Sequence, residues 1–158
     1  MSLYFEDQKI GDVKALGAHT FTREAIIAFA ILYDPQPFHL SEEAGKASIF
    51  GSLIASGWHT ASVCMRLMID GRERARAERA ALGEDLPELG LSPGFRDMRW
   101  LAPVRAGDTI AYSSRVETRR ETKRRQWGLV TARNIGLNQH RAEVFAFTSI
   151  VLWERRPA

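Results

Sequence analysis

The stretch YDPQPFHL, residues 33–40, separates two helical patterns and sets the organisation of the chain. Pro35 and Pro37 fix their own φ angles, and each pushes the residue before it out of the α region. The segment is therefore stiff, and it carries Asp34 near one end and His39 near the other. It predicts a rigid loop that holds a carboxylate near an imidazole. By spacing alone, a structural turn in which Asp34 accepts hydrogen bonds from loop N–H groups explains the pattern equally well.

Helices are predicted on both sides of this loop. Before it, residues 21–33 repeat apolar side chains at helical spacing, and Thr22 is a suitable N-cap. After it, residues 57–69 predict a longer buried helix that Ser56 can cap. Gly71 is a suitable stop for that second helix.

The second half of the chain changes to the period of a strand. Residues 72–94 are first charged and then rich in glycine and proline, so we expect an exposed helical tail and a long loop. From Phe95 onward apolar residues alternate, and antiparallel strands joined by tight turns are predicted over 110–116, 127–135 and 143–154. Residues 3–20 are interpreted as a short leading segment with a turn at Gly11. Helices followed by a long meander predict an α+β fold, which we expect to be one domain over residues 1–158.

Composition narrows the class of protein. The chain has 158 residues, of which 45% are hydrophobic and 26% charged, and its net charge is +3. This composition is typical of a globular protein and does not require nucleic-acid binding. The sequence has no run of about 20 apolar residues that could span a membrane. The single cysteine, Cys64, cannot form a disulfide within the chain, and it is expected to be a core thiol. The N-terminus lacks the pattern of a signal peptide, so a cytoplasmic location is predicted.

Together these features resemble the MaoC-like dehydratases, the (R)-specific enoyl-CoA hydratase group of the hot-dog fold. Asp34, Pro37 and His39 match the family pattern D-x-N-P-x-H, with Gln36 at the position where asparagine is usual. The segment IASGWHT, residues 54–60, matches the small-residue start of the family's central helix, and PVRAGD, residues 103–108, precedes the long strands. The resemblance covers nearly the whole chain and implies an antiparallel sheet wrapped around a central helix.

The resemblance also implies a reaction, the reversible addition of water to a 2-enoyl-CoA thioester. This chemistry needs a base, an acid and a group that stabilises charge on the thioester oxygen. Asp34 and His39 are expected to activate the water. The backbone N–H of Gly57, which lies in the first turn of a helix and has no intrahelical partner, is expected to polarise the thioester carbonyl. The residues expected to contact substrate are Gln36, Ser56, Trp58, Arg99 and Arg105. No metal and no cofactor beyond the coenzyme A of the substrate are expected.

Two other functions stay open at this stage. One is a hot-dog acyl-CoA thioesterase, but such enzymes usually carry a carboxylate on or near the central helix, and residues 57–69 contain neither Asp nor Glu. The other is a non-catalytic acyl-CoA-binding subunit, which the intact pair Asp34 and His39 argues against. His59 is expected to be a packed residue, while His19 and His140 are interpreted as loop residues.

Assembly and ligand charge give the last expectations. Aromatic residues on the predicted strands offer more apolar surface than one helix can cover, and an open sheet edge tends to pair. A homodimer or a dimer of dimers is therefore predicted, with no nucleic acid or membrane as partner. The basic residues 119–126 are expected to form a solvated hairpin tip, with a phosphate-binding role as a second interpretation.

Overall fold

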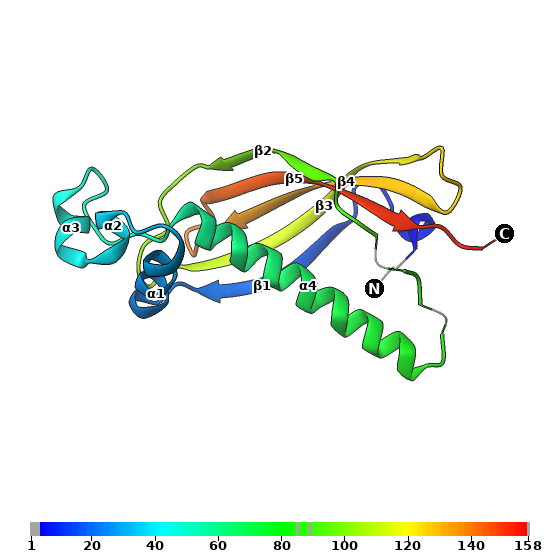
Figure 1. Ribbon diagram of the computed structural model, residues 1–158, viewed down its shortest axis with the longest axis horizontal. Helices are drawn as coiled ribbons and strands as arrows, with labels where there is room; N and C mark the ends of the chain where they lie inside the picture. The colour runs from blue at the N-terminus through cyan, green and yellow to red at the C-terminus, as the bar shows by residue number, and fades with distance from the viewer. Residues whose placement is uncertain (1–3, 85, 89, 158) are drawn as a thin grey trace.

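One antiparallel sheet and one long helix make up most of the structure. The computed structural model describes residues 4–84, 86–88 and 90–157. The five strands lie in the order β1-β3-β4-β5-β2. Their bounds are β1 Val13–Thr20, β2 Gly94–Trp100, β3 Thr109–Glu121, β4 Trp127–Leu137 and β5 Glu143–Glu154. The long helix, α4 (Gly57–Ala81), runs across one face of this sheet (Figure 1), which is the α+β arrangement predicted from the sequence.

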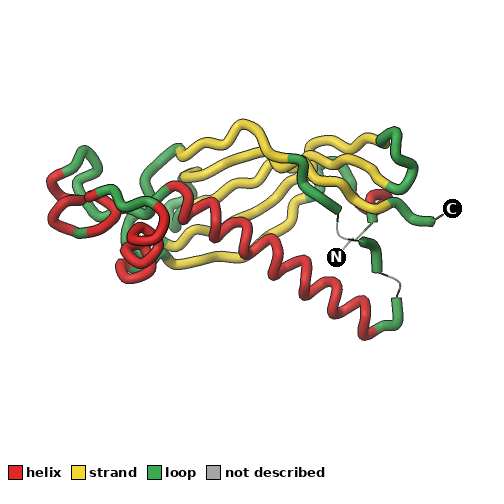
Figure 2. Tube along the Cα trace, viewed as in Figure 1, coloured by secondary structure: helices red, strands yellow, loops and turns green. Residues whose placement is uncertain are grey.

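Three short helices gather at one end of the sheet. They are α1 (Arg23–Tyr33), α2 (Pro37–Leu40) and α3 (Glu42–Ala47), and they lie at the end opposite to both chain termini (Figures 1 and 2). Thr22 caps α1 as predicted, because its hydroxyl accepts a hydrogen bond from the N–H of Ala25 at 3.2 Å. The segment after α1 is stiff as predicted, but it includes a helical turn that begins at Pro37, the position where proline suits a helix start.

The core lies between the first half of α4 and the sheet. Its largest fully buried side chains include Phe21, Ile110, Tyr112, Val144 and Phe145. The hydroxyl of Tyr112 donates to the carbonyl of Thr60 at 3.1 Å and ties β3 to α4. The predicted core thiol is confirmed, since Cys64 is fully buried and burial raises its pKa to about 12. The first half of α4 is therefore held firmly against the sheet.

The interpretation of residues 3–20 as a leading segment is wrong. Residues Val13–Thr20 form the edge strand β1, which pairs with β3, and a short 3₁₀ helix, η1 (Phe5–Asp7), precedes it. The strand shows no clean alternation because Leu16 is its one buried residue and a bulge at Gly17, with φ of 130°, shifts the register. His19, expected in a loop, lies in this strand.

The predicted helix stop at Gly71 is also wrong. Helix α4 continues without a break to Ala81. A glycine inside a helix costs only about 1 kcal/mol relative to alanine. An (i, i+4) ion pair between Arg66 and Asp70, at 2.9 Å, spans the preceding turn, and Ala75 is buried in the turn that follows. The tail predicted to be exposed therefore packs partly against the rest of the protein.

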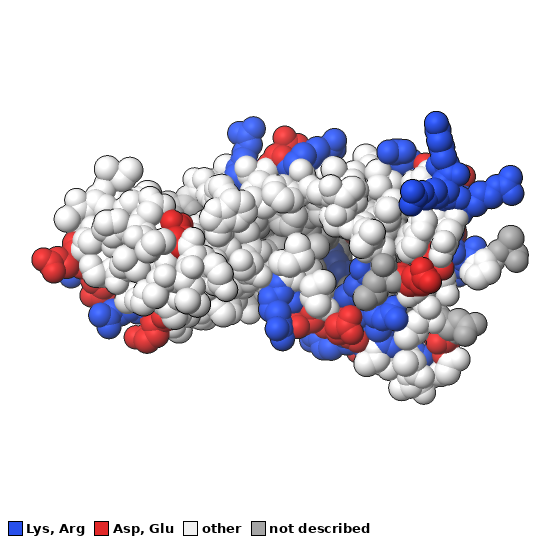
Figure 3. Space-filling view, in the orientation of Figure 1, with Lys and Arg blue, Asp and Glu red and all other residues white. Residues whose placement is uncertain are grey.

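The surface carries its cations unevenly. Lys and Arg side chains gather at the end of the molecule that carries the β3–β4 hairpin (Figure 3), which agrees with the predicted basic hairpin tip. None of the helices formed by the described residues is long and apolar enough to cross a membrane.

Candidate active site

Asp34 and His39 face each other across the turn between α1 and α2. Asp34 is the C-cap of α1, and His39 lies in the single turn of α2. The Nε2 atom of His39 is 3.4 Å from Oδ2 of Asp34. The imidazole side chain is only 6% exposed and the carboxylate side chain 19% exposed, so both groups are largely shielded from solvent. The stiff segment brings the two groups together as the sequence predicted.

The orientation of the His39 ring is fixed by a hydrogen bond and by aromatic packing. Its Nδ1 atom is 2.8 Å from the carbonyl oxygen of Ile54, which can only accept, so Nδ1 carries a proton and donates. Phe38 packs edge-on against the ring, and Phe50 packs against Phe38. The Nε2 atom is therefore the one that faces Asp34 and is available to a reacting molecule.

Two hydrogen bonds keep Asp34 ionised. The hydroxyl of Ser56 donates to Oδ2 at 2.6 Å, and the amide of Gln36 donates to Oδ1 at 2.8 Å. The bond from Ser56 is the largest cause that lowers the pKa of Asp34 below its ordinary value, with smaller contributions from Gln36 and His39 that together outweigh the opposing effect of burial. Ser56 is fully buried and also caps α4, because its oxygen accepts from the N–H of Trp58 at 3.2 Å.

Gly57 begins α4 beside this pair, and its carbonyl is held by a tryptophan. The Nε1–H of Trp100 donates to the Gly57 carbonyl at 2.8 Å. A Cβ atom at position 57 would lie 2.5 Å from the Trp100 ring, so glycine is required there for steric reasons. No described residue accepts a hydrogen bond from the N–H of Gly57, as expected in the first turn of a helix.

The other residues predicted to contact substrate lie on different elements. Trp58 is 53% exposed and packs edge-on against Trp100. Arg105 donates to the carbonyl of Phe50 at 2.8 Å, and so supports the segment in front of α4. Arg99 is exposed on β2 and, as a strand neighbour of Trp100, projects from the opposite face of the sheet. The structure therefore brings Gln36, Ser56 and Trp58 to the site and leaves substrate contacts by the two arginines as predictions.

Sequence reasoning missed Trp100 and the carbonyl of Ile54. Trp100 donates to the carbonyl of Gly57, 43 residues earlier in the chain, and the carbonyl of Ile54 accepts from His39, 15 residues before it. The one available signal was a tryptophan at the end of a strand, directly before the LAPVRAGD segment. Among the described residues there is no group of three or more His, Cys, Asp or Glu side chains that could hold a metal ion.

Most of the chain matches the model of a known protein family. Residues 8–139 match the family model described as a MaoC like domain. Two similar proteins are a 3-hydroxybutyryl-CoA dehydratase from Methylorubrum extorquens, 31% identical, and an (R)-specific enoyl-CoA hydratase from Rhodospirillum rubrum, 32% identical. Each match spans 108 residues, or 68% of this chain, and it covers 60% of the first relative and 65% of the second.

Solved structures show the same fold. A MaoC-like dehydratase from Rhodospirillum rubrum superposes with a TM-score of 0.82 at 35% identity, covering 99% of this chain and 100% of the other. An (R)-hydratase from Pseudomonas aeruginosa has a TM-score of 0.70 at 17% identity, with 98% and 87% of the two chains covered, and supports the fold alone. The hot-dog architecture predicted from the sequence is confirmed.

Proposed function

Because the chain belongs to the MaoC-like domain family, we propose that it adds water reversibly to a 2-enoyl-CoA thioester to give an (R)-3-hydroxyacyl-CoA. The observation that carries this proposal is the pair formed by Asp34 and His39, whose facing atoms lie 3.4 Å apart beside the start of α4. Two groups at this separation can share one water molecule and exchange protons through it.

Asp34 and His39 have different roles in proton transfer. Asp34 is the proton acceptor, because the hydrogen bonds from Ser56 and Gln36 lower its pKa and keep it ionised at neutral pH. In the hydration direction, Asp34 takes a proton from the water while the water oxygen bonds to C3 of the enoyl group. A protonated His39 gives its Nε2 proton to C2, and transfer of the proton from Asp34 to His39 restores the pair. The reaction requires no further cofactor.

The N-terminus of α4 supplies the third requirement. Charge develops on the thioester oxygen as water adds, and a backbone N–H without an intrahelical partner stabilises it, together with the positive end of the helix. Gly57 offers such an N–H, and the hydrogen bond from Trp100 to its carbonyl fixes the orientation of the peptide that follows. The absence of a side chain at Gly57 lets the Trp100 ring pack directly against this peptide.

The experiment is hydration of a panel of 2-enoyl-CoA thioesters by the wild type, Asp34→Asn, His39→Gln and the double variant. Each single change should lower turnover by roughly 100- to 10,000-fold, because each removes a group that moves a proton. The double variant should be little worse than either single variant, since residues that act as a unit are not additive. The melting temperature should stay within a few degrees of the wild type, as neither side chain belongs to the apolar core.

Two results would count against the proposal. Near-normal hydration by Asp34→Asn would make the loop structural. Hydrolysis of saturated acyl-CoA by the wild type, without hydration of any enoyl-CoA, would favour the thioesterase. The structure supplies no carboxylate for that alternative in the first half of α4, where residues 57–69 lack Asp and Glu.

A further inference from the structure

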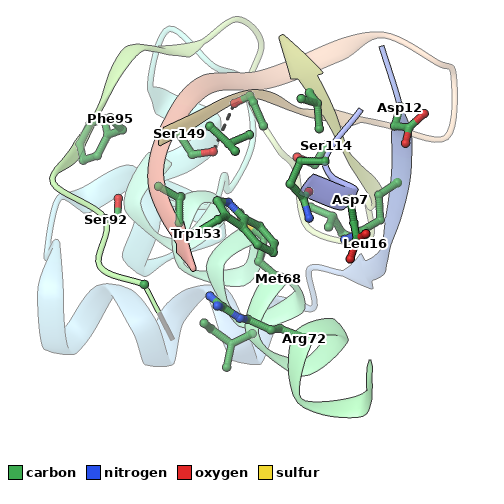
Figure 4. A pocket seen from close by; sticks show the side chains of 18 of the residues that line it. Asp7, Asp12, Leu16, Met68, Arg72, Ser92, Phe95, Ser114, Ser149 and Trp153 are labelled. Carbon is green, nitrogen blue, oxygen red and sulfur yellow. Dashed lines mark hydrogen bonds between the residues drawn. The ribbon is translucent and has the colours of Figure 1, made fainter. Parts of the chain in front are cut away.

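The sheet has an outer face, which is the face away from α4. On the other face, a cavity of about 770 Å³ lies between the sheet and α4, and Ser114 of β3 and Ser149 of β5 are among the residues that line it (Figure 4). Successive side chains of a strand point to opposite faces of a sheet. Arg115 and Thr148, the strand neighbours of these two serines, therefore project from the outer face.

Three arginines lie on one line across this outer face. The strand register places Arg115 of β3 opposite Arg133 of β4. Thr148 of β5 lies opposite Arg133 on one side and opposite Arg96 of β2 on the other. Residues that are opposite each other in neighbouring strands share a face. Because neighbouring strands are about 4.8 Å apart, the backbone positions of Arg133 and Arg96 are roughly 5 Å and 14 Å from that of Arg115.

The charges of this arginine row are only partly balanced by the protein. Arg133 pairs with Glu143 at 2.8 Å, while Arg96 makes a longer contact of 3.7 Å with Asp97, whose side chain is 63% exposed. Arg115 is exposed and forms no ion pair with a described residue. Like charges that lie directly opposite each other in a sheet are destabilising. The facing arginines 115 and 133 are therefore stabilised by an anion supplied from outside the chain.

The chemistry of the row favours carboxylates carried by a protein. Arginine binds a carboxylate through two parallel hydrogen bonds, and Arg133 already binds the carboxylate of Glu143 on this face. Ile135 and Ile150 are partly exposed in the two neighbouring rows of the outer face, and they offer the apolar contacts that protein interfaces use. None of the described residues in these three rows is aromatic, whereas stacking on the bases of a nucleic acid requires aromatic side chains.

We propose that the outer face docks an acidic helix of a partner protein, which lies across the strands along Arg115, Arg133 and Arg96. An α-helix rises 1.5 Å per residue, so carboxylates at positions i, i+3 and i+10 are separated from the first by roughly 5 Å and 15 Å along the axis. These spacings match those of the three arginines, and position i+7, at roughly 10 Å, then faces Thr148. The proposal does not depend on the hydration reaction.

Fluorescence anisotropy of a labelled helical peptide, titrated with the full chain, tests this proposal. The peptide is a stapled, alanine-rich helix with Glu at positions i, i+3 and i+10. Arg115→Met should weaken its binding by roughly tenfold or more, because a hydrogen-bonded charge pair is lost. Arg66→Met is the matched control, since it removes the same charge from an exposed arginine of α4 that pairs with Asp70. It should bind the peptide as the wild type does.

A second peptide separates docking from general attraction between opposite charges. It has the same composition, but its three Glu residues are spread around the helix. The wild type should bind it more weakly than the first peptide by roughly tenfold or more, because it cannot present all three carboxylates to one face. Equal affinity for the two peptides, or equal binding of the first peptide by Arg115→Met and Arg66→Met, would overturn the proposal. Tighter binding of single-stranded oligothymidylate than of the first peptide, lost in Arg115→Met, would also overturn it and assign the face to nucleic acid.

Discussion

Ser56 serves both the helix and the proposed catalytic carboxylate. Its hydroxyl donates to Asp34 at 2.6 Å, while its oxygen accepts from the first turn of α4 at 3.2 Å. One fully buried side chain therefore positions the carboxylate of Asp34 relative to the helix N-terminus.

We predict that Ser56→Ala shifts the acid limb of the pH–rate profile to higher pH. The hydrogen bond from Ser56 stabilises the charged form of Asp34, so its loss raises the pKa of Asp34 toward or above the ordinary value of 3.8. Proposed activity needs the ionised form and is lost as pH falls through that pKa. Between pH 4 and 7, kcat/KM should be nearly flat on the acid side for the wild type and should decline at the low end for the variant.

The loss of a helix cap needs its own control in that experiment. Removing an N-cap costs about 1 kcal/mol by itself. Ser41 caps α3 through the N–H of Ala44 at 3.1 Å and does not touch Asp34, so Ser41→Ala should lower stability without moving the pH–rate profile. Identical profiles for Ser56→Ala and the wild type would show that Ser56 does not control the ionisation of Asp34.

A second residue-scale prediction concerns Gly57→Ala. The new Cβ would collide with the Trp100 ring at 2.5 Å, and the ring cannot withdraw without losing its hydrogen bond to the Gly57 carbonyl. Turnover should fall by roughly tenfold or more, since about 1.4 kcal/mol of lost transition-state stabilisation has that effect. Overpacking should cost about 1–3 kcal/mol of stability.

Gly71→Ala is the matched control for Gly57→Ala on the same helix. No atom lies within 4 Å of the site where its Cβ would be added, so the change should stabilise the helix by up to about 1 kcal/mol and leave turnover unchanged. Enoyl-CoA hydration and urea unfolding of both variants separate crowding at the site from a general effect of alanine in α4. Wild-type turnover in Gly57→Ala would remove the glycine from the proposed mechanism.

At the residue scale, the sequence predicted what proline and spacing control. Asp34 and His39 could be paired because two prolines restrict the four residues between them. The hydrogen bond from His39 to Ile54 and the one from Trp100 to Gly57 could not be predicted. Every residue has a backbone carbonyl, so the residue type does not show which carbonyl will accept. Their partners are chosen by tertiary packing between elements that are distant in the chain.

Elements were predicted where a repeating pattern faces the core. Helix α1 and strands β3, β4 and β5 bury regular sets of side chains, so their periodicity is visible. Strand β1 was missed because an edge strand with one buried residue shows little pattern. The length of α4 was missed because its second half is mostly charged and buries only Ala75, so it shows little apolar pattern.

His59, at the buried start of α4, gives the element-scale prediction. It stacks on Phe29 of α1 and packs edge-on against Phe21, and its Nδ1 has no hydrogen-bond partner among the described residues. Burial, with a smaller contribution from the charge of His19, lowers its pKa from 6.5 to about 4. The unfolded chain therefore binds a proton at this residue before the folded protein does, and stability falls as pH drops from about 6.5 to about 4.

The expected loss is up to roughly 3 kcal/mol, at about 1.4 kcal/mol for each pH unit. His59→Phe keeps an aromatic ring among its aromatic neighbours and should remove this part of the pH dependence. Urea unfolding at pH 7.5 and pH 4.5 measures the difference for both proteins. His140→Gln, in an exposed turn, should behave as the wild type does. The same pH dependence in His59→Phe and the wild type would assign the effect to other groups.

At the scale of the whole molecule, the sheet has one edge that is both open and apolar. Strand β2 pairs with β5 on one side and has no strand neighbour among the described residues on the other. Trp100 and Leu101, at the end of this strand, are 46% and 51% exposed, and the exposed ring of Trp58 packs against Trp100. An open edge beside a group of exposed aromatic and aliphatic side chains favours pairing with another chain.

We therefore predict a two-fold homodimer in which β2 pairs with its copy. The described chain contributes the same patch to both sides, as a two-fold interface requires. Light scattering at micromolar concentration should give twice the chain mass of 17.8 kDa. Leu101→Lys, which places a charge in the patch, should shift the protein toward the monomer. Leu82→Lys alters a leucine that is 74% exposed at the far end of α4 and should leave the dimer intact.

The dimer and the proposed site are coupled through Trp100. This side chain lies in the patch and also holds the carbonyl of Gly57, so exposing the patch loosens the start of α4. Leu101→Lys should then lower enoyl-CoA hydration along with the mass, whereas Leu82→Lys should change neither. A wild type that is monomeric and fully active at micromolar concentration would contradict both parts of the prediction. A monomeric Leu101→Lys with full activity would contradict only the coupling, because the site would then be complete within one chain.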